Sequence, residues 1–275
     1  MPHEPPPTTT IFTRVILTPL IVERRIQDAL RHHAPRGRDT EQIGPFLATF
    51  TRDTANPYLN YAIPDEGGTA TPDDVLALVD AYRARERKPR LEYIPSVAPT
   101  VEAALLEAGF EIEGRLPLMT CATPRFEAPV GIELVSPSTE EEFRSVAEVQ
   151  WEAYGEGDPL SDSAVAGLRR TADTGGVVVL ARSSETGEAS GGGLCVAPHD
   201  GVSELAAIGV REKYRRRGIA TAMAGWLTQA ALEKGMTLVF LMAGGPDEAR
   251  IYRRAGFVDR GEVLHISLSE ERSRS

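Results

Sequence analysis

The chain has 275 residues, of which 41% are hydrophobic and 25% are charged, and its formal net charge is -10. This composition is typical of a globular protein with two domains of ordinary size, and no apolar run reaches the roughly 20 residues that a membrane-spanning helix needs. The acidic balance argues against a general nucleic-acid-binding protein and is compatible with a cationic substrate. Cys121 and Cys195 lack metal-type spacing, so we expect two buried small side chains rather than a disulfide or a metal centre.

The first half begins with residues 1–10, which are rich in proline and threonine. They lack the basic and apolar segments of a signal peptide, which predicts a disordered leader and a cytoplasmic protein. Two prolines bracket a predicted linker at 125–129 and divide the chain into domains at 11–124 and 130–275. Within the first domain, the pattern predicts helices at 20–33, 40–52 and 75–88 and a strand at 91–94.

The second half alternates strand and helix signals, and Ser138 with Glu141 resembles a capping box. A proline opens its last predicted helix and Gly256 closes it. We expect an α/β fold, a mixed sheet with helices on its faces. The predicted strands are 132–135, 177–182, 191–198, 203–210, 238–242 and 263–268, and the predicted helices are 139–154, 161–174, 220–234 and 246–255.

An internal repeat relates the two halves at a fixed offset of 147 residues. Ala108-Gly-Phe110 matches Ala255-Gly-Phe257, and a gapless alignment then places 91–94 on 238–241 and 61–64 on 208–211. This coincidence predicts a duplication. The first copy has no evident counterpart of the hairpin at 177–198, so we expect it to be truncated. It also carries Gly68, Thr71 and Asp73 where the second has Arg215, Gly218 and Ala220, which predicts a degenerate copy and one ligand site per chain.

The segment Val210-Arg-Glu-Lys-Tyr-Arg-Arg-Arg-Gly-Ile-Ala-Thr221 surrounds a glycine with five cations, between an apolar strand and a helix. Glycine lets the backbone approach a ligand closely. The N–H groups of the first helical turn, together with the helix dipole, favour an anion at that point. The segment therefore predicts a phosphate-binding loop.

Arg215-x-x-Gly218-x-Ala220 resembles the acyl-CoA pyrophosphate loop of the GCN5-related N-acetyltransferases (GNAT). Tyr252-Arg-Arg-Ala-Gly-Phe257, after an apolar strand, resembles the second hallmark of that family. The resemblance covers residues 130–275, and it implies two tandem GNAT domains of which the first is degenerate. It also implies an acyltransferase without a metal, which moves acetyl from acetyl-CoA directly to a primary amine in a ternary complex.

The resemblance implies a role for each matching residue. The strand residues Ile208, Gly209 and Val210 would face the pantetheine of acetyl-CoA, with Gly209 at a bulge. Tyr252 would protonate the departing thiolate. Glu204, on the same strand face as Ala206, Ile208 and Val210 by period two, is the candidate base for the amine. Backbone N–H groups of the loop would bind the pyrophosphate, with extra charge from Arg215 and Arg217; the loop residues are Arg215, Arg216, Arg217, Gly218, Ile219, Ala220 and Thr221.

Several alternatives stay open. His199, Asp200 and His265 are other candidate bases, and Phe143, Trp151 and Tyr154 line either an acceptor pocket or the core. Many family members have Asn before the tyrosine helix. This chain has Gly244-Gly-Pro-Asp247 there, so the helix cap passes to Gly245 or Asp247. An acetyl-CoA sensor with little catalysis and a nucleic-acid module are the competing functions. We expect a small-molecule amine substrate, no nucleic-acid or membrane partner, and a monomer or homodimer.

Overall fold

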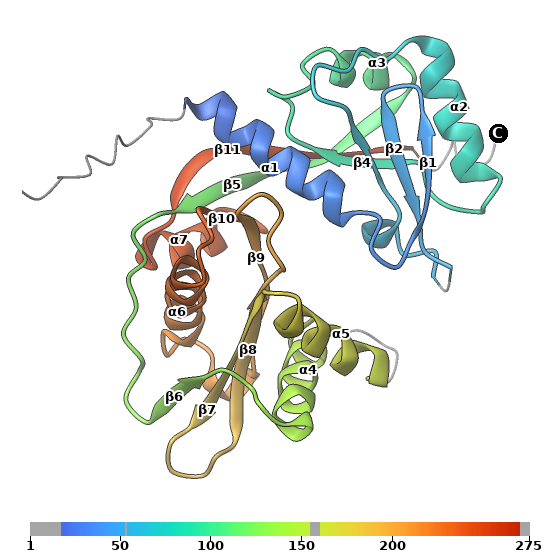
Figure 1. The fold of residues 1–275 in the computed structure, drawn as a ribbon. Helices are drawn as coiled ribbons and strands as arrows, with labels where there is room; N and C mark the ends of the chain where they lie inside the picture. Colours follow the sequence, from blue (N-terminus) through green and yellow to red (C-terminus); the bar gives the residue numbers. More distant parts are fainter. Residues whose placement is uncertain (1–17, 53, 155–159, 270–275) are drawn as a thin grey trace, which may run out of the picture.

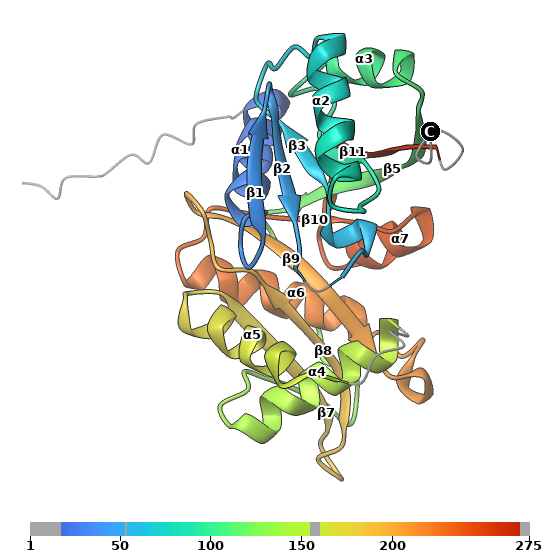
Figure 2. The same ribbon diagram turned by 90° about the vertical axis from the view of Figure 1, so that its right-hand side faces the viewer.

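A computed structural model describes residues 18–52, 54–154 and 160–269. The predicted leader at 1–10 lies outside the described residues. Among these residues, one mixed sheet of 11 strands runs through both halves, in the order β1-β2-β3-β4-β11-β5-β10-β9-β8-β7-β6, and helices cover its faces (Figure 1, Figure 2). None of the described helices is long and apolar enough to cross a membrane. The predicted α/β class is confirmed.

The helices are α1 (Pro19–His33), α2 (Pro72–Arg83), α3 (Val101–Glu107), α4 (Glu140–Tyr154), α5 (Asp162–Asp173), α6 (Ile219–Glu233) and α7 (Pro246–Arg254). The strands are β1 (Asp39–Ile43), β2 (Phe46–Phe50), β3 (Ala62–Pro64), β4 (Arg90–Tyr93), β5 (Phe110–Cys121), β6 (Ile132–Val135), β7 (Val177–Ser183), β8 (Ala189–Cys195), β9 (Val202–Val210), β10 (Leu238–Met242) and β11 (Val258–Leu268). Each element predicted in the second half is present, although β11 begins earlier than expected.

The predicted helix at 40–52 is wrong. The segment forms the antiparallel hairpin β1–β2, which turns at Gly44-Pro45. Gly44 has a φ of 50°, a conformation that glycine adopts without strain, and its proline neighbour cannot continue a helix. The hairpin lies at one end of the sheet order, as β6–β7–β8 lie at the other. The first half therefore has a counterpart of the β7–β8 hairpin that the sequence did not reveal.

The predicted cap of α4 is displaced by one residue. The side chain of Thr139 accepts from the Glu142 N–H at 3.2 Å, and the Glu142 carboxylate accepts from the Thr139 N–H at 3.2 Å. These reciprocal bonds form a capping box. Thr139 and Glu142 take the roles expected of Ser138 and Glu141, because the helix begins at Glu140.

The two halves exchange their last strands. The first half's β5 lies between β11 and β10, and the second half's β11 lies between β4 and β5. The core beneath α2 and α3 consequently includes Leu264, Ile266 and Leu268 from β11. The core beneath α6 and α7 includes Met119 and Cys121 from β5. Each half thus completes the other's core, although they are separate in sequence.

The register of this central pair is symmetric. Leu116 lies opposite Val263, which is its counterpart at the offset of 147 residues. Gly114 lies opposite His265, and the reciprocal pair of counterparts, Leu118 and Gly261, also face each other. The register shifts once at Glu113 in β5 and once at Arg260 in β11, again equivalent positions. A local twofold relation therefore passes through the middle of the sheet.

The gapless alignment of the two halves fails after the equivalent helices α2 and α6, so the strands that follow them, β4 and β10, are out of register. Both helices begin at equivalent positions, but α2 has 12 residues and α6 has 15. Tyr93 of β4 faces the core beneath α2, whereas Phe240, its gapless counterpart, faces α1 on the other side of the sheet. An odd shift of register reverses the two faces of a strand. The shorter loop before α7 restores the offset.

Candidate functional site

The strands β9 and β10 diverge at the centre of the second half. Their parallel pairing runs from Val202 with Leu238 to Glu204 with Phe240, and no further pair is formed among the described residues. A cavity of about 890 Å³ opens beyond this point, beside the start of α6. It is lined by the predicted residues Glu204, Ile208, Val210, Arg215, Arg216, Gly218, Ile219, Ala220, Thr221 and Tyr252; Gly209 and Arg217 do not line it.

The N-terminus of α6 faces this cavity without a cap. Gly218 is the N-cap with a φ of 84°, and no side chain hydrogen-bonds to the first turn. Arg216 also has a positive φ of 61°. Within the described part of the chain, the backbone N–H groups of residues 216–221 donate to no protein acceptor. Such a row of free donors at a helix N-terminus favours an anion.

The cations of the loop separate into two groups. Arg211 bonds to Glu152 at 2.9 Å, and Lys213 pairs with Glu188. The arginines at 215–217 have no carboxylate partner among the described residues: Arg215 Nε donates to the Val210 carbonyl at 3.1 Å, and Arg217 lies over the Tyr214 ring. Positive charge thus remains uncompensated only at the end of the loop next to the α6 N-terminus.

Glu204 lies at the apex of the gap between β9 and β10. Burial, with a smaller contribution from Glu92, raises its pKa to about 7. Its neighbour Leu205 packs in the core beneath α6, so the Glu204 side chain points to the opposite face. A group with this pKa exchanges a proton near neutral pH.

The prediction that Glu204 shares a strand face with Ile208 and Val210 is wrong. The strand bulges at Ala207, which has a φ of 54°. The extra residue reverses the alternation, so Ile208 and Val210 pack toward α6 whereas Glu204 does not. The bulge is not at Gly209 as expected. A Cβ at Gly209 would lie 3.0 Å from the Ala153 Cβ, so the close approach of α4 explains that glycine.

Tyr252 lies on α7 with its ring in edge contact with Phe257. Burial, followed by the charge of Glu248, raises the pKa of its phenol, which stays protonated at neutral pH. Of the two predicted caps of α7, Gly245 is the N-cap, whereas Asp247 lies inside the first turn of the helix. Glu248 accepts from the Gly244 N–H at 2.8 Å, and Gly245 is an N-cap without a side-chain bond. Glu248 carries no sequence signal of this role, because glutamate is common in the first turn of helices.

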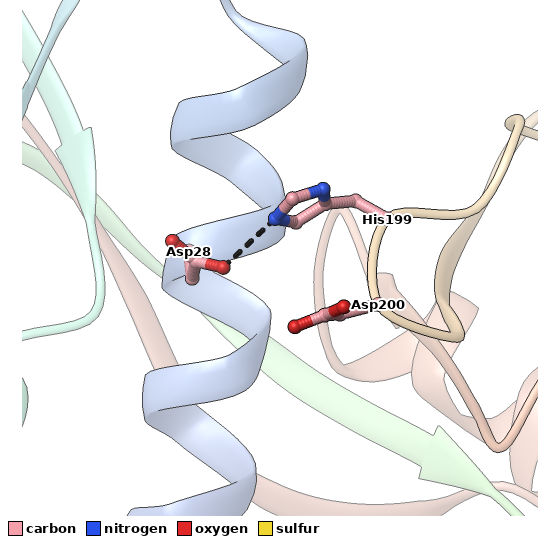
Figure 3. A group of neighbouring side chains, drawn as sticks. All are labelled: Asp28, His199 and Asp200. Carbon is pink, nitrogen blue, oxygen red and sulfur yellow. Dashed lines mark hydrogen bonds and ion pairs between the residues drawn. The ribbon is translucent and has the colours of Figure 1, made fainter.

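The other candidate bases lie outside the cavity. His199 reaches across to α1, where its Nε2 lies 2.9 Å from Asp28 Oδ2, with Asp200 beside it (Figure 3). These three side chains hold potential metal-ligand atoms within 4.8 Å of one another. Arg25 donates to the Asp200 carbonyl, which brings a cation to the same place. His265 contacts the buried Arg90 guanidinium at 3.0 Å.

The remaining predicted side chains divide between core and surface. Phe143 is buried between α4 and the sheet, and Trp151 is exposed. Tyr154 lines the cavity and bonds to the Ile208 carbonyl at 3.3 Å. Both cysteines are buried, as expected. Burial raises the pKa of the Cys195 thiol to about 12.

Comparison with known proteins agrees with this geometry. Residues 143–257 match the model of the Acetyltransferase (GNAT) family. A GCN5-related N-acetyltransferase from Kribbella flavida is 25% identical with a TM-score of 0.72, over 90% of this chain and 95% of that one. The protein from Sphaerobacter thermophilus with the same description is 19% identical with a TM-score of 0.60, over 81% and 76% of the two chains.

A tandem GNAT protein from the clavulanic acid biosynthesis pathway has the same fold, with 14% identity and a TM-score of 0.55, over 81% of this chain and 78% of that one. No protein with a curated description matches the chain. The fold and the family match together define an acyltransferase. The chain therefore contains a domain of the GNAT acetyltransferase family, which the family model places at residues 143–257.

Proposed function

We propose that the protein transfers acetyl from acetyl-CoA to a primary amine, by direct attack of the amine in a ternary complex. The observation that carries the proposal is the cavity between β9 and β10, which joins an uncapped helix N-terminus to a half-buried carboxylate and a protonated phenol. Its volume of about 890 Å³ falls in the range of small-molecule sites.

The pyrophosphate of acetyl-CoA fits the loop that ends in Gly218. Free N–H groups at 216–221 supply donors, and the unpaired guanidinium groups of Arg215 and Arg216 add charge-assisted bonds. The unpaired edge of β9 beyond Glu204 is then available to the amides of the pantetheine. The Val210 N–H is our candidate for polarising the thioester carbonyl.

Proton transfer falls to two residues on different elements. Glu204, through water or directly, takes a proton from the incoming ammonium, because an amine attacks only when it is neutral. Attack forms the C–N bond of the amide and breaks the C–S bond of the thioester. Tyr252 then gives its phenolic proton to the departing CoA thiolate, and the second proton, which the nitrogen loses as the amide forms, restores the phenol through solvent. Cys195 takes no part, since its buried thiol has a pKa of about 12 and cannot serve as a nucleophile.

One site per chain follows from a contrast between α2 and α6, which begin at equivalent positions. The N-terminus of α2 is closed by its own capping box, in which Thr71 and Asp74 bond to each other's backbone N–H groups. Asp73 and Asp74 also place negative charge where α6 has none. An anion is therefore excluded at α2, which supports a degenerate first copy that frames the second.

The test is release of CoA thiol from acetyl-CoA with a panel of primary amines, including polyamines, aminoglycosides and amino acids. We expect at least one amine to raise thiol release well above background. An acetyl-CoA sensor is the second candidate function, because the free N–H groups at 216–221 can bind acetyl-CoA without any catalytic step. It would be favoured if acetyl-CoA bound tightly while no amine released thiol.

A further inference from the structure

A second hollow lies on the other side of the phosphate loop and has no assigned role. It has a volume of about 600 Å³ and shares Gly218, Thr221 and Arg254 with the main cavity. Another part of its wall is the linker at 125–129 with the adjoining Val130, which all lie outside the residues matched by the family model. The two hollows therefore adjoin each other at the N-terminus of α6.

The linker is fixed against α6. The Arg125 N–H donates to the Ala255 carbonyl at 2.9 Å, at the end of α7. A Cβ on Gly225 would lie 2.3 Å from the Arg125 carbonyl oxygen, so α6 can accept the linker only because residue 225 is glycine. Further along, Pro129 lies 4.0 Å from the position of a Cβ on Gly218. These contacts hold the Arg125 backbone beside the phosphate loop.

Three arginines from different elements line the hollow: Arg125 from the linker, Arg217 from the loop and Arg254 from α7. None of them has a carboxylate partner among the described residues. Neighbouring Arg253, in contrast, is bound by both oxygens of Asp259, and Arg250 pairs with Asp247. Glu127 is the carboxylate that lines the same hollow. The arrangement leaves an excess of positive charge, which is the chemistry of a second phosphate site.

We propose that this hollow binds the 3′-phosphate of the CoA ribose, with Arg125, Arg217 and Arg254 as its ligands. This inference rests on the proposed function. With the pyrophosphate at the start of α6 and the pantetheine in the main cavity, the adenosine would extend away from that cavity, and the hollow adjoins the start of α6 at Gly218 and Thr221. The linker thus determines whether the enzyme distinguishes CoA from 3′-dephospho-CoA.

Calorimetric titration with CoA and with 3′-dephospho-CoA tests the inference. The wild type is expected to bind CoA about tenfold more tightly, because several charge-assisted bonds to an exposed phosphate together contribute about 1.4 kcal/mol. Arg125→Ala weakens CoA binding about fivefold and leaves 3′-dephospho-CoA unchanged. Glu127→Gln strengthens CoA binding alone. Arg250→Ala, which removes the same charge from α7 outside the hollow, changes neither.

The outcomes separate the two proposals. Equal affinity of the wild type for both nucleotides overturns this inference and leaves the acetyltransferase proposal standing. Equal weakening of both nucleotides by Arg125→Ala also overturns it, because the residue would then only support the loop. Failure of both nucleotides to bind would refute this inference and the proposed function together.

Discussion

Arg115 and Glu262 form an ion pair across the centre of the sheet, and they occupy equivalent positions, 147 residues apart. The pair joins β5 to β11, one strand from each half, next to the point where Leu116 faces Val263. A residue can meet its own counterpart only near a twofold axis. The contact therefore shows that the halves are joined through their exchanged last strands.

Strand exchange predicts that a substitution in one half destabilises the core of the other. Leu264 is fully buried in the core beneath α2 and α3. We expect Leu264→Ala to cost about 2–5 kcal/mol of unfolding free energy and to speed hydrogen exchange in β2 and β4. Met119→Ala is the reciprocal control, with faster exchange in β10. Exchange confined to the mutated half would contradict this picture.

The raised pKa of Glu204 predicts an acidic limb in the pH profile of kcat/KM. Its pKa is raised to about 7, and the base works only when deprotonated, so kcat/KM should rise as pH increases through about 7. Glu204→Gln removes the limb and lowers kcat about 100-fold. Glu92→Gln removes a charge that raises this pKa, so the limb moves to lower pH. A limb unchanged in Glu204→Gln would assign the base elsewhere.

Tyr252 predicts a loss in the chemical step without a loss of binding. Tyr252→Phe removes the proton donor and keeps the ring that packs against Phe257, so kcat should fall about 100-fold while the Kd for acetyl-CoA changes little. Steady-state kinetics with a titration of acetyl-CoA checks both. Tyr58→Phe, on an exposed tyrosine outside the cavity, is the matched control. A parallel loss of binding would indicate a packing role for the phenol.

Cys195 predicts resistance to thiol reagents. Its side chain is buried and burial raises its pKa to about 12, so iodoacetamide should not label it in the folded protein at pH 8. Cys195→Ala should keep kcat within about twofold, because the direct mechanism needs no acyl-enzyme. Mass spectrometry of the labelled protein supplies the first measurement. Rapid labelling with loss of activity would argue for a covalent intermediate.

The lowered pKa of the buried His33 side chain predicts that the folded protein loses stability in mild acid. Burial, followed by the charge of Arg36, lowers its pKa to about 4, and both ring nitrogens are buried without a hydrogen-bond partner among the described residues. The unfolded chain takes up this proton near pH 6.5, so the stabilising contribution is complete above that pH and is lost as pH falls toward 4.

Urea unfolding at pH 7.5 and pH 5 measures this effect. We expect a smaller difference between the two values in His33→Leu than in the wild type. His32 and His265, whose pKa values burial also lowers, add to the slope, whereas Glu204, whose pKa is raised to about 7, opposes it, so the comparison of the variant with the wild type carries the test. An identical pH dependence in the variant would assign the acid sensitivity to His32 and His265 instead.

Local sequence patterns were sufficient to predict much of the secondary structure and the main motifs. The second half's elements, the arginine loop, Tyr252 and the Ala-Gly-Phe repeat all depend on residues adjacent in sequence, where glycine, proline and apolar periodicity act directly. The hairpin at 39–50 could not be predicted in this way, and its sequence pattern predicts a helix instead. Its buried residues pack against α2 and β11, partners remote in sequence, and those contacts override the local helical signal.

Non-local contacts also decided details of the site. The bulge at Ala207 changes which strand residues share a face with Glu204, and it is visible only through the pairing of β9 with β8. Glu248 accepts a hydrogen bond from the Gly244 N–H in the turn before α7, where the sequence pointed only to Gly245 and Asp247 as caps. Neither residue has a distinctive sequence signal, because Ala and Glu are common in ordinary strands and helices.

The sequence by itself determined the fold class, the family of the second half and the position of the arginine-rich loop before α6, because helix starts, glycine turns and charge runs are local properties. Tertiary structure alone decided that β5 and β11 change places, that Arg115 meets Glu262, and that Glu204 is desolvated at the apex of the gap. Strand order and burial depend on contacts between segments more than a hundred residues apart. Local sequence patterns do not report such long-range contacts.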